Sequence, residues 1–445
     1  MKRRTVWPTL ALACAAAAAS PPASAETLRE AVEQAVRTNP EVLASAHRRF
    51  AADEGVKQAL GGYLPRIDLN AGTGRERLDS ADTRLLGLSE TTFARHDTSV
   101  TLSQMLFDGF AVQSEVARQR ARVDSSAYGV AATAEDLALR TVGTYLEVLR
   151  RQETVVEAAD NLDAHQRIYN QIRKLSESGV GRRADLDQAE SRLALAKDNL
   201  RQEQSSLRDA EVSYVRLVGT PPRALLIPDS PDNALPPSEG MALDAASNGH
   251  PAVKSAEADV AVASALNSGA KAALSPRVDL ELAANRGNDI VRGVTNDRTI
   301  MLRLRYNFSS GGADLARISE TGFQVQEASE VLNRTRRQVQ ENVSLAYNAN
   351  VTARDRLGVL RQYVDASAAT RESYAKQFSI GQRTLLDLLN AENEYFNARL
   401  AYTTGQYAQL ASAFRIFAGM GQLLGNLQIT LPTEAVAVRG RSGHD

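Results

Sequence analysis

The hexapeptide Leu-Pro-Arg-Ile-Asp-Leu stands at residues 64–69, and a similar one, Ser-Pro-Arg-Val-Asp-Leu, stands at residues 275–280. Each is preceded by a proline at the same distance: Pro40 lies 25 residues before Pro65, and Pro251 lies 25 residues before Pro276. A proline-free run of 155 residues then follows the proline of each hexapeptide. Self-similarity at a fixed spacing indicates one structural unit that is used twice.

The duplication extends outward from the two hexapeptides. Gly179 and residues 185–190 match Gly381 and residues 387–392, and prolines gather between the two halves. Prolines of this density are typical of a connecting segment. The sequence therefore predicts a first repeat at 26–219, a Pro-rich linker at 220–240, a second repeat at 241–430 and a disordered tail at 431–445.

The N-terminus has the pattern of an export signal. Three basic residues precede an apolar stretch, and Ala23-Ser24-Ala25 has the small residues that a leader peptidase requires. We expect residues 1–25 to be a signal peptide, with cleavage after Ala25. Cys14, the one cysteine of the chain, lies inside this segment, so the processed chain would contain neither a disulfide nor a catalytic thiol. An alternative is that Cys14 is a lipidation site, which the alanine at position 11 argues against.

Strand pairs are predicted at residues 65–108 and 276–309, because apolar and polar side chains alternate there with a period of two. The segments are about 10 residues long, as tilted membrane strands are. Leu302 and Leu304 belong to the apolar set, which we expect to face lipid. The lumen-facing set is expected to contain four charged residues: Asp279, Glu281, Arg303 and Arg305. A soluble sheet with one wet face would show the same alternation.

Long helices fill the rest of each repeat. The first repeat predicts one helix from about Phe110 to Glu177 and a shorter one from about Arg183 to Val218, and a helix at 27–62 precedes the strands. The two shorter helices, placed end to end, match the long one in length. This predicts a cylinder of antiparallel helices with strands at one end, and the alternative is a simple coiled-coil rod. Four strands cannot close a barrel, so membrane strands would require association with further copies of the chain.

These features together resemble the TolC-like outer-membrane efflux protein family over essentially the whole processed chain. The resemblance is carried by Asn39-Pro40-Glu41, by the strand-to-helix joins at 107–109 and 306–312, and by the paired glycine turns. Its most specific part is residues 378–394, Phe-Ser-Ile-Gly-Gln-Arg-Thr-Leu-Leu-Asp-Leu-Leu-Asn-Ala-Glu-Asn-Glu.

The resemblance implies a mainly α protein with a small β part. Three chains of four strands each would form a 12-stranded β-barrel in the outer membrane of a Gram-negative bacterium, above an α-helical barrel in the periplasm. It also implies a homotrimer that works with a periplasmic adaptor and with an inner-membrane pump or ABC transporter. Within the family, the Gly-Gly join near 307–312 and the Gln-Arg-Thr-Leu-Leu-Asp stretch at 382–387 look most like those of type I protein secretion channels, with drug or metal efflux as the alternative.

The resemblance also assigns candidate site residues at the periplasmic end. The hairpin turns would meet the adaptor through Gly179, Val180, Gly381 and Gln382. Asp185 and Arg383 match the family's gate-latching acid and base, and its tyrosine partner is replaced by Phe378. Asp387 matches the inner of two acidic rings, whereas the second ring position is the uncharged Asn390. The alternative for each charged residue is that it lies on a solvated helix face.

Other classes of function find little support in the sequence. The net charge of −1 gives no reason to expect a nucleic-acid partner. The sequence contains no catalytic constellation, no metal-ligand spacing of histidines and no phosphate-binding loop, so we expect no enzyme activity, metal or cofactor. A periplasmic coiled-coil adaptor or structural protein remains as the alternative of another class, although neither would need two equivalent strand pairs.

Overall fold

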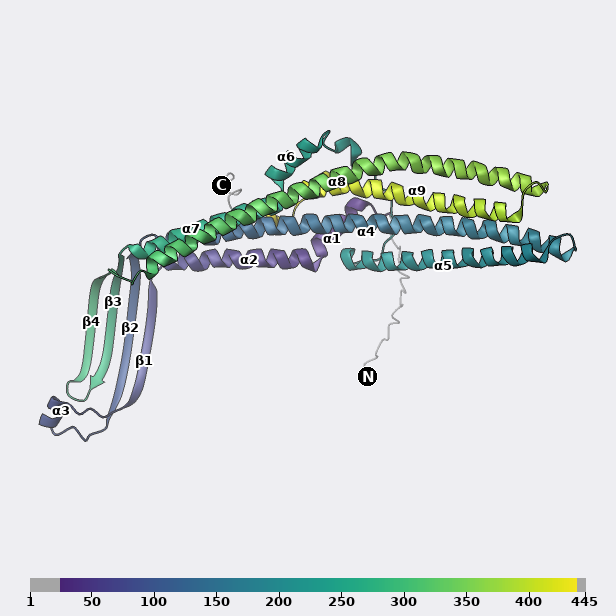
Figure 1. Ribbon diagram of the computed structural model, residues 1–445. Coiled ribbons are helices and arrows are strands. Elements are labelled where there is room, and N and C mark those ends of the chain that lie inside the picture. The colour runs from purple at the N-terminus through teal and green to yellow at the C-terminus, as the bar shows by residue number, and fades with distance from the viewer. Residues whose placement is uncertain (1–24, 438–445) are drawn as a thin grey trace, which may run out of the picture.

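The computed structural model describes residues 25–437 and consists of a long helical bundle with a four-stranded sheet at one end (Figure 1). Two helices of 67 residues each, about 100 Å long, run most of the length of the bundle. The elements of the first repeat are α1 Leu28–Thr38, α2 Pro40–Leu60, β1 Arg66–Glu76, α3 Ala81–Leu85, β2 Phe93–Phe107, α4 Ala111–Glu177 and α5 Arg183–Val218. Those of the second are α6 Glu239–Gly249, α7 Pro251–Lys271, β3 Arg277–Asp289, β4 Gly293–Arg305, α8 Ala313–Ser379, α9 Leu385–Gly419 and α10 Leu423–Asn426. Short 3-10 turns lie at Gly61–Tyr63, Pro231–Ala234, Ala272–Leu274 and Thr433–Ala435.

Both repeats break their first helix at the same proline position. The helix predicted at 27–62 is divided at Pro40, because α1 ends at Thr38 and α2 begins with Pro40 as its first residue, where a missing N–H costs nothing. The Asn39 side chain accepts a hydrogen bond from the Glu41 N–H at 2.9 Å. His250 does the same before Pro251, with its Nδ1 3.1 Å from the Ala252 nitrogen. The duplication seen in the sequence therefore includes the side-chain cap at the start of α2 and of α7.

The four strands form one antiparallel sheet in the order β1-β2-β3-β4, and both outer strands have a free edge. Paired residues share a face, so the register sorts the side chains into two sets. Ile67 pairs with Leu102, which pairs with Leu282, which pairs with Ile300, and this row is apolar. Asp279 pairs with Arg303 on the other face. The sheet therefore has one apolar face and one charged face, as the alternation predicted.

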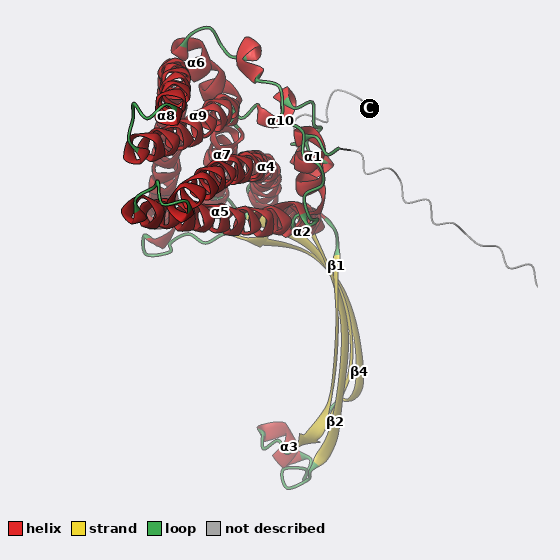
Figure 2. Cartoon of the chain, turned by 90° about the vertical axis from the view of Figure 1, so that its right-hand side faces the viewer, coloured by secondary structure: helices red, strands yellow, loops and turns green. Residues whose placement is uncertain are grey.

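The strand ends differ from the predicted ones. The strands are 11 to 15 residues long rather than about 10. β2 includes the stretch 93–95, and β3 and β4 include the stretches 287–289 and 293–298, whose polar composition is more typical of loops. β4 ends at Arg305, before Phe308. The loop between β1 and β2 contains the short helix α3, which lies on the concave side of the bowed sheet (Figure 2). The polar residues at 287–289 and 293–298 have a low intrinsic preference for strands, but their hydrogen bonds to the neighbouring strand keep them in the sheet.

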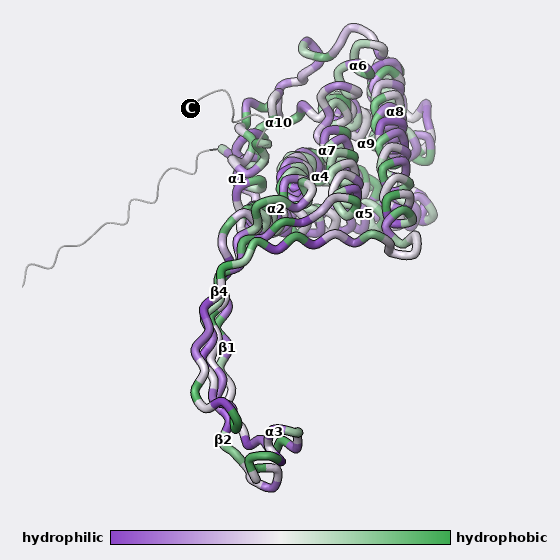
Figure 3. The backbone as a smooth tube through the Cα atoms, turned by 90° about the vertical axis from the view of Figure 1, so that its left-hand side faces the viewer, coloured by the Kyte–Doolittle hydropathy of each residue, from purple (hydrophilic) through white to green (hydrophobic). Residues whose placement is uncertain are grey.

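The main core lies midway along the bundle, where α4 is surrounded by α1, α5, α9 and α10. Tyr145, Tyr214 and Phe414 are its largest fully buried side chains, and alanines fill the closer helix contacts. Glu26 anchors the start of the first repeat there, because it accepts a hydrogen bond from the Tyr214 hydroxyl at 2.7 Å. Hydropathy along the chain alternates over short distances, as expected where each helix buries only one stripe (Figure 3).

The C-terminal segment corrects one prediction. Residues 431–437 are not a disordered tail, because they contain a 3-10 turn, and Ala435 packs against Val130 and Ala131 of α4. Residues 438–445 lie outside the described part of the chain, as do residues 1–24, which hold most of the predicted signal peptide and Cys14. Across residues 25–437, every helix is too short or too polar to span a membrane.

Candidate functional site at the hairpin tips and in the sheet

Two helix hairpins end side by side, at the end of the molecule opposite the sheet (Figure 1). One turn joins α4 to α5 and the other joins α8 to α9. Gly179 and Gly381 have φ angles of 77° and 78°, a left-handed conformation that glycine adopts without strain. Each turn exposes an aliphatic side chain, since Val180 is 79% and Ile380 is 67% exposed. The structure thus places the four predicted tip residues together at one apex, where an apolar partner surface could contact them.

A small apolar cluster holds the two hairpins together just behind the turns. It combines Ile168 and Ile172 of α4 with Ala189 of α5 and with Leu385, Leu388 and Leu389 of α9. The Phe378 ring packs against this cluster. Phe378 therefore contributes apolar contact at the position where the family resemblance expects a tyrosine.

Arg383 and Asp387 interact within their own hairpin. Thr384 and Asp387 form a capping box at the start of α9, with the Asp387 carboxylate accepting a hydrogen bond from the Thr384 hydroxyl at 2.9 Å. Arg383 lies 3.9 Å from the same carboxylate, donates to Gln377 Oε1 at 3.0 Å and stacks 4.3 Å from the centre of the Tyr374 ring. One hydroxyl-bearing ring thus accompanies Arg383, one helical turn before Phe378.

Asp185 and Asn390, unlike Arg383 and Asp387, do not interact with each other or with a residue of their own turn in the described part of the single chain. Asp185 is half-buried in the first turn of α5, and the structure of the single chain does not pair it with Arg383. Asn390 accepts a hydrogen bond from Arg192 of α5 at 3.2 Å, which links the two hairpins. Sequence reasoning missed Arg192, because nothing local marks a partner 198 residues away. It also missed Tyr374, although a tyrosine four residues before Phe378 on one helix face was a usable signal.

A second polar connection between the hairpins lies farther from the tips. Thr403 of α9 donates to Glu157 of α4 at 2.7 Å, and Arg399 contacts Glu157 and Asp160 at 3.6 and 2.9 Å. Glu157 is only 3% exposed, and burial raises the pKa of its carboxyl. A buried carboxylate that depends on a neighbouring helix for its partners fixes the register of that helix.

The charged face of the sheet gathers the four predicted lumen residues into one cluster. Arg303 lies 2.7 Å from Glu281, and Arg305 reaches both Glu281 at 2.6 Å and Asp279 at 3.6 Å. Arg277 adds a further ion pair to Asp279 at 3.0 Å. Asp279 is 3% exposed, whereas Leu302 on the opposite face is 68% exposed. The structure thus confirms that the charged and the apolar side chains lie on opposite faces of the sheet.

The sequence model of the outer membrane efflux protein family matches residues 31–220 and again residues 242–422. The chain belongs to this family. One match over each half agrees with the internal duplication, and the family places the protein in the outer membrane, as a channel for transport.

Individual efflux family members align with most of the chain. The outer membrane protein TolC of Vibrio cholerae is 27% identical, over 90% of this chain and 91% of its own. The proteases secretion protein PrtF of Dickeya chrysanthemi is 25% identical, over 92% of this chain and 90% of its own. The crystal structure of the Campylobacter jejuni CmeC outer membrane channel superimposes with a TM-score of 0.77 at 16% identity, covering 89% of this chain and 86% of that one. The mainly α fold with a small β part is thereby confirmed.

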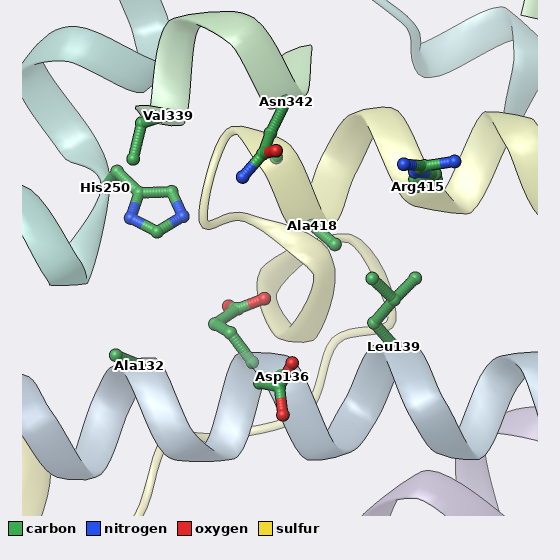
Figure 4. A pocket seen from close by; sticks show the side chains of 10 residues that line it. Ala132, Asp136, Leu139, His250, Val339, Asn342, Arg415 and Ala418 are labelled. Atoms are coloured by element: carbon green, nitrogen blue, oxygen red, sulfur yellow. The ribbon is translucent and has the colours of Figure 1, made fainter. Parts of the chain in front are cut away.

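Midway along the bundle, this efflux family protein has a cavity of about 300 Å³ between α4, α8 and α9, lined by both polar and apolar residues (Figure 4). Asp136, Asn342 and Arg415 line it together with His250. Glu135 also lines it, and its carboxylate accepts hydrogen bonds from the backbone nitrogens of Leu423 and Leu424 at 3.0 and 3.3 Å. Burial raises the pKa of the Glu135 carboxyl to about 7, despite these two donors.

We expect Glu135 to make the native fold less stable at pH 8 than at pH 5. Because its native pKa lies above the unfolded value of 4.5, the folded state binds the proton more tightly, so stability falls as the pH rises from 4.5 through 7. The expected loss is about 3 kcal/mol. In circular-dichroism melts, Glu135→Gln should remove most of the fall in melting temperature between these pH values.

A matched variant separates this effect from that of the neighbouring histidine. Burial lowers the pKa of His250 below its ordinary value of 6.5. The stability that the neutral imidazole contributes is therefore lost as the pH falls below 6.5, whereas the contribution of Glu135 is lost as the pH rises. The cap that His250 provides needs an acceptor, which asparagine also supplies. His250→Asn removes a contribution of the opposite sign, so it should leave the fall in stability between pH 5 and 8 in place or enlarge it. If Glu135→Gln melts with the full pH dependence of the natural chain, Glu135 is charged throughout.

Proposed function

We propose that the protein is a passive exit duct for a tripartite export system, assembled as a homotrimer. The observation that carries this proposal is the sheet, which has one apolar face, one charged face and two free edges. Free edges of this length call for pairing with another strand, and a closed ring of three sheets would supply 12 strands. The apolar face would then meet lipid and the cluster around Asp279 would line the lumen.

The helices support the same assembly. Hairpins of this length would extend the duct across the periplasm to a periplasmic adaptor and an inner-membrane pump or ABC transporter, which the tips at Gly179, Val180, Gly381 and Gln382 would contact. The energy for transport would come from that partner, and we propose no enzyme activity for the chain. Asp185, Phe378, Arg383, Asp387 and Asn390 would form the gate at this end, with Asp185 and Arg383 pairing between neighbouring hairpins of the ring.

Type I protein secretion is the export route that we propose. Its support is the relative from Dickeya chrysanthemi, whose name assigns it to protease secretion and which aligns with 92% of this chain. The second candidate, drug or metal efflux, is favoured by the name of the family itself. Complementation of two hosts distinguishes them, one lacking the channel of a type I system and one lacking a drug-efflux channel. Restored secretion with no restored drug resistance is the expected result, and the reverse would replace type I secretion by efflux.

Cysteine accessibility tests the membrane placement. The processed chain has no cysteine of its own if residues 1–25 are removed, so a single introduced thiol reports on one position. In outer-membrane vesicles, Arg303→Cys should react rapidly with a charged, membrane-impermeant maleimide, and Leu302→Cys should react at least tenfold more slowly because its thiol would lie in hydrocarbon. Equal labelling of the two positions would show that both faces of the sheet contact water, and would contradict the barrel proposal.

A further inference from the structure

The apolar face of the sheet changes character toward the end that lies remote from the helices. Along β4, the residue that follows Ile300 on this face is Arg298, and along β3 the residue that follows Ala284 is Arg286. On β1 the same face ends with Arg75. All three arginines are exposed. The face thus ends in a set of cations, Arg75, Arg286 and Arg298, which we call the distal arginines.

Arg286 and Arg298 are close neighbours. Arg298 pairs with Ala284 and Arg286 pairs with Asn296, so the two arginines occupy diagonal positions on adjacent strands. Such diagonal positions lie about 7–8 Å apart, and their Cβ atoms are somewhat closer. Two like charges at this distance repel one another, so the arrangement calls for an anion from elsewhere.

The sheet itself supplies no such anion on this face. The acidic residues at the same level, Glu76, Asp97 and Asp297, have the opposite parity and lie on the charged face. Arg95, which shares that face, forms ion pairs with Glu76 at 2.9 Å and Asp97 at 2.8 Å. Among residues 25–437, by contrast, the distal arginines form no ion pair.

The other end of the same face has no cations. Leu304 lies there, followed by Tyr306 and Phe308, whose rings pack edge to face with their centres 5.9 Å apart. From Leu304 to Arg298 the strand rises about 20 Å, which approaches the height of about 25 Å of a lipid-facing apolar band. The face therefore shows an aromatic end near the helices, an apolar middle and a cationic end.

We propose that the distal arginines dock the phosphate groups of an anionic lipid in the outer leaflet of the outer membrane. The proposal rests on the proposed function, which turns the apolar face toward lipid and the distal end toward the cell exterior. A guanidinium group binds phosphate through two parallel N–H donors and is always charged. Arg286 and Arg298 directly adjoin the apolar residues on the same face of the sheet. A phosphate group that is attached to acyl chains could therefore contact both, which a soluble ion could not.

Lipid titration of the purified, processed oligomer tests this proposal. The probes are diphosphoryl lipid A and neutral phosphatidylcholine, and native mass spectrometry counts the lipids that remain bound. The natural chain should retain lipid A in preference to phosphatidylcholine, and Arg286→Gln with Arg298→Gln should weaken lipid A binding at least tenfold. The paired substitution to lysine should keep part of the affinity, because the charge stays while the bidentate geometry is lost. Arg334→Gln with Arg337→Gln, two exposed arginines of α8, is the charge-matched control and should change nothing.

The outcomes separate the lipid site from the duct. No preference for lipid A in the natural chain, or an unchanged preference in the glutamine pair, overturns the lipid proposal. Displacement of lipid A by excess inorganic phosphate alone also overturns it, in favour of a soluble anion. Failure of the natural chain to appear as a heat-modifiable oligomer in the outer membrane would count against the duct instead. If the glutamine pair does not form that oligomer, lipid A binding is measured instead on Arg286→Gln, on Arg298→Gln and on the lysine pair, and unchanged binding in all three overturns the lipid proposal.

Discussion

Replacing Gly381 with valine should abolish export while the oligomer and its membrane insertion survive. Gly381 has a φ of 78°, and no atom lies within 4 Å of where a Cβ would stand. The cost of the substitution therefore comes from the backbone conformation and not from a steric clash. A left-handed conformation costs an ordinary residue about 1–2 kcal/mol of conformational free energy, and a β-branched residue more. A turn that is forced out of the left-handed region would displace Gln382, which we place at the adaptor contact, together with the exposed Ile380 beside it. The measurement is the amount of secreted substrate, alongside a heat-modifiability gel.

Two other glycines serve as controls for this prediction. Gly358→Val, in α8, also adds its Cβ into open space but has no left-handed φ, so export should continue. Gly421→Ala combines a φ of 68° with a Cβ only 2.4 Å from the Pro251 ring, so it should lose the folded oligomer altogether. Secretion at the natural level by a Gly381→Val oligomer would remove this turn from the functional site.

The long helices were predictable because their ends are marked locally. Glycine at the turns and proline at the repeat starts determine where the chain can leave the helical conformation, and α5 begins at Arg183 and ends at Val218 as the sequence suggested. The helix α3 was missed although Ser80 and Thr83 form a capping box, because five residues are too few to show a period. Ala435 was assigned to a disordered tail because its contact with α4 joins residues that are about 300 positions apart.

The candidate site was predictable in position but not in pairing. Repeat symmetry and the family resemblance placed the tip residues, and the structure brings both turns to one end. Which partner each side chain selects depends on how the two hairpins lie against each other. Arg383 stays with Gln377 in its own hairpin, whereas Asn390 crosses to Arg192, and no spacing in the sequence distinguishes these two outcomes.

Replacing Asp387 with asparagine should nearly remove the cation selectivity of the channel. Three copies of Asp387 around a narrow axis would concentrate negative potential, and each substitution removes one charge from that ring. Asparagine keeps a side-chain oxygen that can accept the Thr384 capping hydrogen bonds, so the fold of the α9 start should remain. Single-channel recording in planar bilayers measures both the selectivity and the block by a trivalent cation. Unchanged values of both would place Asp387 on an outer helix face.

The reverse change at Asn390 should have a smaller effect than its added charge suggests. An aspartate at this position would face Arg192, which already donates to Asn390 at 3.2 Å, and the ion pair would neutralise much of the new charge. Asn390→Asp alone should therefore raise cation selectivity only slightly and should tie α5 more firmly to α9. Adding Arg192→Gln releases the carboxylate, so the double variant should show the strong selectivity and block of a channel with two acidic rings. Arg192→Gln alone removes a cation but adds no ring, so a large gain in that single variant would mean that Arg192, rather than a second ring, controls the entrance.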